Sequence, residues 1–117
     1  MWFDIVRDYC VSLPGVTEEF PFGPDTIVWK VAGKMFCLGN AEQFRSINLK
    51  CDPERAAELR ESIEQVQPGY HMNKTMWNTV VLDGLSWNFV QDLIRHSYDE
   101  VVRKLPKTTQ TILKQKQ

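Results

Sequence analysis

Hydrophobic residues recur along this chain at two different spacings, which together predict most of its elements. At residues 2–13 apolar side chains return every three or four positions with polar ones opposite, so this segment is predicted to be an amphipathic helix ending at Pro14. The same spacing runs longest at residues 89–105, behind the capping residue Ser86, and stops at Pro106. These two segments are the predicted major helices.

Between these helices the spacing shortens to two, which is the period of a β-strand. Ile27, Trp29 and Val31 alternate with residues directed to the opposite face, and turns containing glycine or asparagine bound the runs. Residues 17–25, where two prolines flank Phe22, are predicted to form a fixed loop. The strand-like runs predict an antiparallel meander and one further strand, over residues 26–31, 34–38, 45–50 and 75–82.

A third helix is predicted after Asp52-Pro53, a capping residue followed by proline at the first helical position, and residues 66–68 are a candidate short strand. The order α-β-β-β-α-(β)-β-α predicts an α+β fold, with helices packed on one face of an antiparallel sheet. Because 117 residues suffice for one core, residues 1–106 are predicted to be a single domain. The basic segment 107–117 is expected to be a mobile tail.

Composition narrows the functional classes. No apolar run is long enough to span a membrane, and the first residues do not resemble a secretory signal, so we expect a cytoplasmic protein. Cys10, Cys37 and Cys51 have no paired spacing, so we expect them to be reduced and buried. With only His71 and His96 besides these cysteines, the sequence predicts neither a metal site nor a cofactor.

The net charge of −1 hides an uneven distribution. Residues 103–117 contain five basic side chains and no acidic one, so residues 1–102 carry a net charge of −6. A body this acidic repels a phosphate backbone unless its basic groups gather on one face. The distribution therefore argues against strong nonspecific DNA binding.

The richest candidate site lies at residues 68–82, where a Pro-Gly turn opens a polar and aromatic run. Imidazole, ammonium, amide and indole groups within nine residues suit an anionic or planar ligand; they belong to Tyr70, His71, Asn73, Lys74, Trp77 and Asn78. A purely structural interpretation is also open. In it Trp77 packs in the core, Asn73 fixes the turn and His71 satisfies buried backbone groups.

Three functions are compatible with these residues, and the leading one is that of a non-enzymatic binding protein. The first is nucleic-acid binding by basic and aromatic side chains on the hairpins and the central loop, through Lys30, Lys34, Lys50, His71, Lys74 and Trp77. The second is a small-molecule or catalytic pocket between the 18–23 loop and the 70–78 loop, built from Glu18, Glu19, Phe22, His71, Asn73, Lys74 and Trp77. The third is protein–protein interaction through the sheet face.

The simpler alternatives are scattered solubilising lysines and solvated acids. The sequence has no glycine-rich phosphate loop, HExxH or GxSxG motif, although short acid–base constellations leave no such signature. His96 is expected to make a surface ion pair with one of its acidic neighbours, Asp92, Asp99 or Glu100.

Five segments together resemble the MmcQ/YjbR family over nearly the whole chain outside the tail. They are LPGVTEEFPFGPDT at 13–26, the VxGKMF block at 31–36, NLKCDPERAAELR at 48–60, PGYHMNKTMWNTV at 68–80 and SYDEVVRKLP at 97–106. The resemblance implies a small bacterial cytoplasmic protein with a fold similar to CyaY, the bacterial frataxin. The family is often labelled DNA-binding because its hairpins form a double-wing arrangement, which is an analogy at the level of the fold.

Two departures limit what the resemblance implies. The family usually carries histidine where this chain has Met76, so a role that needs two imidazoles in that loop is not carried over. Frataxin-type iron binding needs an acidic ridge, whereas the first helix offers only Asp4 and Asp8. Iron is therefore not expected.

Overall fold

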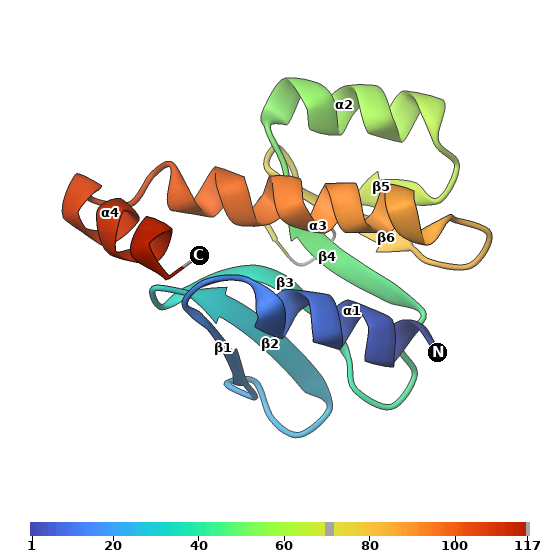
Figure 1. The fold of residues 1–117 in the computed structure, drawn as a ribbon. Helices are drawn as coiled ribbons and strands as arrows, with labels where there is room; N and C mark the ends of the chain where they lie inside the picture. Colours follow the sequence, from blue (N-terminus) through green and yellow to red (C-terminus); the bar gives the residue numbers. More distant parts are fainter. Residues whose placement is uncertain (70–71, 117) are drawn as a thin grey trace.

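One antiparallel sheet organises the protein (Figure 1). The structure, a computed structural model, describes residues 1–69 and 72–116. The strands of the sheet lie in the order β1-β2-β3-β4-β6-β5. The elements, in chain order, are α1 (Trp2–Ser12), β1 (Val16–Glu19), β2 (Thr26–Val31), β3 (Lys34–Asn40), β4 (Ser46–Lys50), α2 (Pro53–Ser62), β5 (Val66–Pro68), β6 (Trp77–Val81), α3 (Trp87–Val102) and α4 (Lys107–Gln115).

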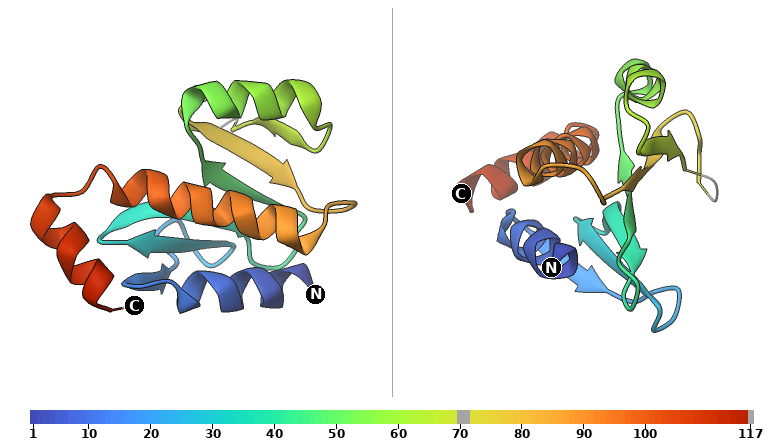
Figure 2. Two further views of the ribbon diagram at one scale, coloured as in Figure 1. Left: turned by 45° about the horizontal axis from the view of Figure 1, so that its top comes forward. Right: turned by 90° about the vertical axis from the view of Figure 1, so that its right-hand side faces the viewer.

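The helices cover one face of this sheet, as the sequence predicts. Helices α1 and α3 lie side by side across it, while α2 sits beyond them above β5 and β6 (Figure 2). Between helices and sheet lies the main core, whose largest fully buried side chains include Trp29, Phe36, Ile27, Ile47 and Ile94. The opposite face has no helix on it among the described elements.

A β-bulge changes which residues of β3 face the core. Trp29 of β2 pairs with Cys37 and the next residue pairs with Met35, so Phe36 is an extra residue in β3. Phe36 and Cys37 both reach the covered core, whereas Met35 and Leu38 belong to the opposite face. The alternation of faces that is usual in a strand therefore fails in the middle of β3.

Helix α3 is fixed to the sheet by a buried hydroxyl. The fully buried Ser97 Oγ donates to the carbonyl oxygen of Phe36 at 2.5 Å and accepts from the backbone N–H of Lys50 at 2.8 Å. These bonds satisfy backbone groups at the bulge and at the end of β4, which would be costly to bury unpaired. At the next residue the Tyr98 hydroxyl donates to the carbonyl oxygen of Pro14 at 2.6 Å.

The α+β class is confirmed, and the structure adds two elements to the predicted order. Residues 16–19, the larger part of which was predicted to belong to a fixed loop, form the edge strand β1 beside β2. Residues 107–115 form helix α4, where we predicted a tail without helix or strand; its mobility stays a prediction. Leu113 of α4 is buried against Gly15, where an added Cβ would clash with the Leu113 side chain.

Candidate functional site

The uncovered face of the sheet carries a small apolar cluster of its own. Val28, Leu38 and Trp77 are its buried members, and three methionines pack against them: Met35, Met72 and Met76. Trp77 is only 8% exposed, so its indole is a packing group with little surface left for stacking on a base. This supports the interpretation of Trp77 as a buried packing residue. Trp77 belongs to the apolar cluster on the uncovered face and not to the main core beneath the helices.

The loop before β6 is held in place by backbone and amide contacts. Asn73 Oδ1 accepts from the backbone N–H of Thr75 at 3.0 Å, and the Asn73 carbonyl accepts from the N–H of Trp77 at 2.9 Å. Arg60 of α2 donates to Asn78 Oδ1 at 2.7 Å and to the Lys74 carbonyl at 3.3 Å. Asn73 and Asn78 therefore act structurally in this arrangement, with Asn78 itself buried.

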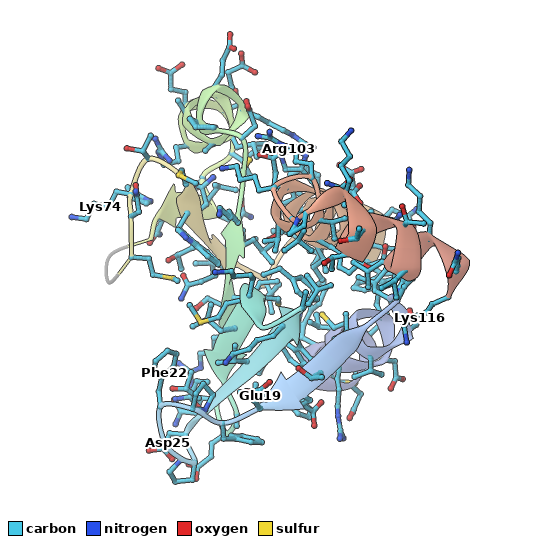
Figure 3. The ribbon with its side chains drawn as sticks, turned by 90° about the vertical axis from the view of Figure 1, so that its left-hand side faces the viewer. Glu19, Phe22, Asp25, Lys74, Arg103 and Lys116 are labelled. Atoms are coloured by element: carbon cyan, nitrogen blue, oxygen red, sulfur yellow. The ribbon has the colours of Figure 1, made fainter. Side chains whose placement is uncertain are left out.

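The predictions for Tyr70 and His71 lie outside the described residues. Lys74, in the same loop, is exposed at one end of the uncovered side, and Phe22 lies at the other end (Figure 3). The structure thus separates two residues that we predicted in one pocket.

A pocket of about 450 Å³ opens on the uncovered face, between the loop that follows β1 and the loop that precedes β6. We call it the face pocket. Phe22, 64% exposed, comes from the loop after β1, and Met72 comes from the loop before β6. Its lining residues are Phe22, Thr26, Met35, Leu38, Gly39, Asn40, Ser46, Asn48 and Met72. Of the residues predicted for a ligand pocket, Phe22 lines this one, and the other described ones do not.

The two acidic residues predicted for that pocket are engaged elsewhere. Glu18 lies on the covered side, where its carboxylate accepts two hydrogen bonds from Arg7, at 2.8 and 2.9 Å, and one from the Trp29 indole at 3.1 Å. Glu19 pairs with Lys30, with 3.1 Å between Oε1 and Nζ, and the bond to Lys30 lowers the pKa of Glu19. The alternative pocket that grouped these acids with Lys74 does not form, because β1 and the 72–76 loop belong to opposite ends of the sheet.

A second pocket, of about 400 Å³, brings three lysines together; we call it the basic pocket. Lys34 begins β3, Lys50 ends β4 and Lys104 follows α3, so three separate elements supply the ammonium groups. The full lining is Lys34, Met35, Lys50, Trp77, Val101, Lys104 and Leu105. Lys34, Lys50 and Trp77 belong to the predicted nucleic-acid set, whereas Lys30 and Lys74 do not line this pocket.

The charges in the basic pocket perturb one another. Burial lowers the pKa of Lys50, and the positive charges of Lys104, Arg103 and Lys34 lower it further, against the opposing effect of Glu100. Glu100 is itself bound by Arg103 through two hydrogen bonds, at 2.8 and 2.9 Å, which lower the pKa of Glu100. The lysines therefore hold an excess of positive charge that the nearest acid does not cancel.

The predictions for His96 and for the three cysteines concern residues away from the face pocket and the three lysines, and only the second is confirmed. His96 makes no ion pair among the described residues; its Nε2 accepts from the backbone N–H of Asp52 at 3.1 Å, just before α2. The cysteines are all buried, as predicted, and burial raises the pKa of the Cys51 thiol to about 11. A thiol with so high a pKa is a poor nucleophile at neutral pH.

Across residues 1–69 and 72–116 no three His, Cys, Asp or Glu side chains gather as a metal site would require. Within the same residues no helix is both long and apolar enough to cross a membrane.

Comparisons with known proteins place the chain among bacterial relatives. The YjbR family model matches residues 11–100. The uncharacterised Escherichia coli O157:H7 protein YbdF is 38% identical over 111 residues, covering 92% of this chain and 89% of its own length. The uncharacterised protein YjbR of E. coli K12 is 32% identical over 109 residues and covers 92% of each chain.

Two crystal structures show the same fold. Deinococcus radiodurans protein DR2400 superposes with a TM-score of 0.89 at 38% identity, covering 96% of this chain and 87% of that one. A protein from Pseudomonas syringae superposes with a TM-score of 0.70 at 26% identity, covering 83% of this chain and 96% of that one. The family model and the extent of these matches establish that the chain belongs to the YjbR family.

Proposed function

We propose that the protein binds an uncharged, partly apolar small molecule in the face pocket. The observation that carries this proposal is a pocket of about 450 Å³ on the sheet face without helices. Binding sites for small molecules are typically clefts of about 300–1,000 Å³ with apolar walls and a few polar groups. The face pocket has this size and this kind of lining.

The lining indicates the chemistry of the ligand. Phe22, Met35, Leu38 and Met72 offer an aromatic ring and flexible apolar side chains that can adapt to a planar molecule. None of the described lining residues is charged, which supports an uncharged ligand.

The polar groups of the pocket are hydroxyls and amides, from Thr26, Ser46, Asn40 and Asn48. The Thr79 hydroxyl donates to Asn48 Oδ1 at 2.6 Å, which fixes the amide and leaves its NH₂ group to donate to a ligand. Asn40 Oδ1 is occupied by the backbone N–H groups of Glu42 and Gln43, at 2.9 and 2.8 Å. Both amides are therefore fixed through their oxygens, and their NH₂ groups can donate to a ligand that has an acceptor oxygen or nitrogen.

The test is a titration with the neutral fluorescent probe N-phenyl-1-naphthylamine. Ser46 lines the pocket, so Ser46→Phe should fill it and weaken probe binding by about tenfold or more. Ser62, exposed at the end of α2, provides the matched control Ser62→Phe. Equal affinities of the two variants would refute the proposal.

Nucleic-acid binding is a second candidate, and one observation favours it: Lys34 and Lys50 line one pocket with Lys104. Fluorescence anisotropy with single- and double-stranded DNA at low salt tests it. The candidate predicts weaker binding for Lys50→Glu than for Lys30→Glu, because Lys30 is already paired with Glu19. Indifference to both substitutions would remove it.

A further inference from the structure

We infer that the basic pocket binds the terminal phosphoryl group of a small molecule. This inference goes beyond the proposed function, because the basic pocket and the face pocket are separate cavities and, among the described residues, their linings share only Met35. A phosphoryl dianion needs several N–H donors converging on one compact space. The basic pocket offers three ammonium groups around about 400 Å³.

Each of the three lysines is mounted on ordered backbone. Lys34 follows the tight turn at Ala32 and Gly33, whose φ angles of 50° and 78° are those of a hairpin turn that matches the strand twist. Lys50 is held through its backbone N–H by Ser97 Oγ at 2.8 Å. The N–H of Lys104 bonds to the Val101 carbonyl at 3.2 Å, in the last turn of α3. Fixed mounting lowers the entropic cost of gathering three flexible side chains around a ligand.

The walls of the pocket are apolar, which strengthens the attraction between ammonium and phosphate. Trp77 lies directly across from Lys50 in the β4–β6 pairing. Val101 and Leu105 add aliphatic surface from the end of α3. Charge pairs beside such surface are less screened by water than pairs on an open face.

Two features oppose an anion at this place, and both are counterbalanced. Glu100 is negatively charged, but Arg103 binds both of its oxygens. The last carbonyl groups of α3 carry partial negative charge, and Arg103 and Lys104 stand at that end of the helix. Lys34 and Lys50 then remain as positive charges that neither feature offsets.

The lowered pKa of Lys50 is consistent with this crowding of like charges. A bound dianion would offset both the repulsion from Lys104 and Lys34 and the loss of solvation at Lys50.

The distribution of charge favours a compact anion over a polymer. Of the basic residues predicted to bind nucleic acid, Lys30 is paired with Glu19 and Lys74 lies outside the basic pocket. The predicted basic residues therefore do not all gather at one binding surface. The chain as a whole carries a net charge of −1. An extended phosphate backbone would gain attraction at this pocket and little from a chain whose net charge is −1.

The experiment is an NMR titration of the full chain, which follows the Trp77 indole N–H signal, assigned from its disappearance in Trp77→Phe. The probes are inorganic phosphate, adenosine 5′-monophosphate, adenosine as the uncharged match, and a short single-stranded DNA with hydroxyl groups at both ends. We expect the two phosphate-bearing small molecules to shift the signal and adenosine to leave it unchanged. Phosphate and monophosphate arms together separate a free anion from a phosphate ester.

The variants test the lysines directly. Lys50→Gln should weaken binding of the monophosphate about tenfold, since it removes one charge-assisted contact, and Lys50→Arg should retain most of it. Lys116→Gln, with the same loss of charge just after α4, is the control and should bind as the unmodified chain does. A melting temperature measured for each variant separates loss of binding from loss of folding.

Three results would overturn the inference. They are no shift of the indole signal with either phosphate probe, equal weakening in Lys50→Gln and Lys116→Gln, or tighter binding of the hydroxyl-ended DNA than of the monophosphate. The last result would assign the pocket to a nucleic-acid backbone. Because the face-pocket test uses an uncharged probe and Ser46→Phe, failure of either test leaves the other unaffected.

Discussion

The two faces of the sheet are made from the same strands, yet they differ in what covers them. On the covered face, Phe36 and Ile47 are fully buried beneath helices that supply large apolar side chains. On the uncovered face, Leu38 and Trp77 are covered by methionines and by two loops, and a pocket remains between these loops. One face is closed by packing and the other keeps room for a ligand.

This difference separates stability from binding within one structure. Removing a side chain from the covered face leaves a cavity that rigid helices cannot close, whereas methionines on the other face can move into vacated space. We therefore expect substitutions on the covered face to change the free energy of unfolding strongly. Substitutions around the face pocket should change ligand binding more than stability.

The largest effect is expected for Phe36→Ala. Phe36 is fully buried and its ring packs edge-on against Tyr98, with 5.5 Å between centroids. Truncation should lower the free energy of unfolding by about 3–5 kcal/mol, as measured by urea denaturation. A loss of less than about 1 kcal/mol would show that the covered face is not the rigid core described above.

Ser97→Ala should have the next largest effect. The substitution leaves the Phe36 carbonyl and the Lys50 N–H without the hydroxyl that both use. Leaving buried backbone groups unpaired should cost about 2–3 kcal/mol, and chemical denaturation measures it. Ser97→Cys is the matched control, because it keeps a side chain of similar size whose thiol is only a weak hydrogen-bonding group. If Ser97→Cys were as stable as the unmodified chain, the role given to the hydroxyl would be contradicted.

A smaller effect is expected for Leu38→Ala on the uncovered face. Leu38 is 8% exposed, and Met35 and Met72 lie beside it in the lining of the face pocket. The loss in unfolding free energy should be about 2 kcal/mol or less, because flexible neighbours can fill the space. The comparison fails if this loss equals that of Phe36→Ala under the same conditions.

The smallest effect is a change in acid sensitivity. Hydrogen bonds from Arg103 lower the pKa of Glu100 in the folded protein, so its ionised form stabilises the fold above the pKa of the unfolded chain. This stabilisation is lost as the pH falls through the folded-state pKa. Between about pH 5 and about pH 3 the unmodified chain should therefore lose more stability than Glu100→Gln, by less than about 1 kcal/mol. Parallel urea titrations at several pH values measure this difference, and identical pH profiles would contradict it.

Sequence periodicity predicts the covered face well because burial there repeats with the strand. Ile27, Trp29 and Val31 alternate as predicted and are all buried, and Ile47 and Leu49 repeat the pattern in β4. The bulge at Phe36 has no such signal, because it depends on how β3 pairs with β2.

The added elements were missed for a related reason. Residues 16–19 pair along β2 as an edge strand, and a strand formed by tertiary pairing need not have a strongly apolar sequence. Helix α4 buries Leu113, with Gly15 as a close neighbour, a contact between the two ends of the chain that no local pattern contains.

The candidate sites could be predicted only in part. Phe22, Lys34 and Lys50 were found by side-chain type, and each lines one of the two pockets. Lys104 was missed as a site residue because α3 brings it to the strand ends only in the folded chain. Asn48 was missed because a polar residue on an alternating strand looks the same whether it faces solvent or a pocket.

The central claim is that the uncovered sheet face, and not the rest of the surface, takes a small molecule. Methyl NMR of the four methionines tests it directly: Met35 and Met72 line the face pocket, while Met1 is 98% exposed at the start of the chain. On addition of N-phenyl-1-naphthylamine we predict large shifts for Met35 and Met72, none for Met1, and loss of these shifts in Ser46→Phe. Shifts confined to Met1, or shifts that persist unchanged in Ser46→Phe, would contradict the account.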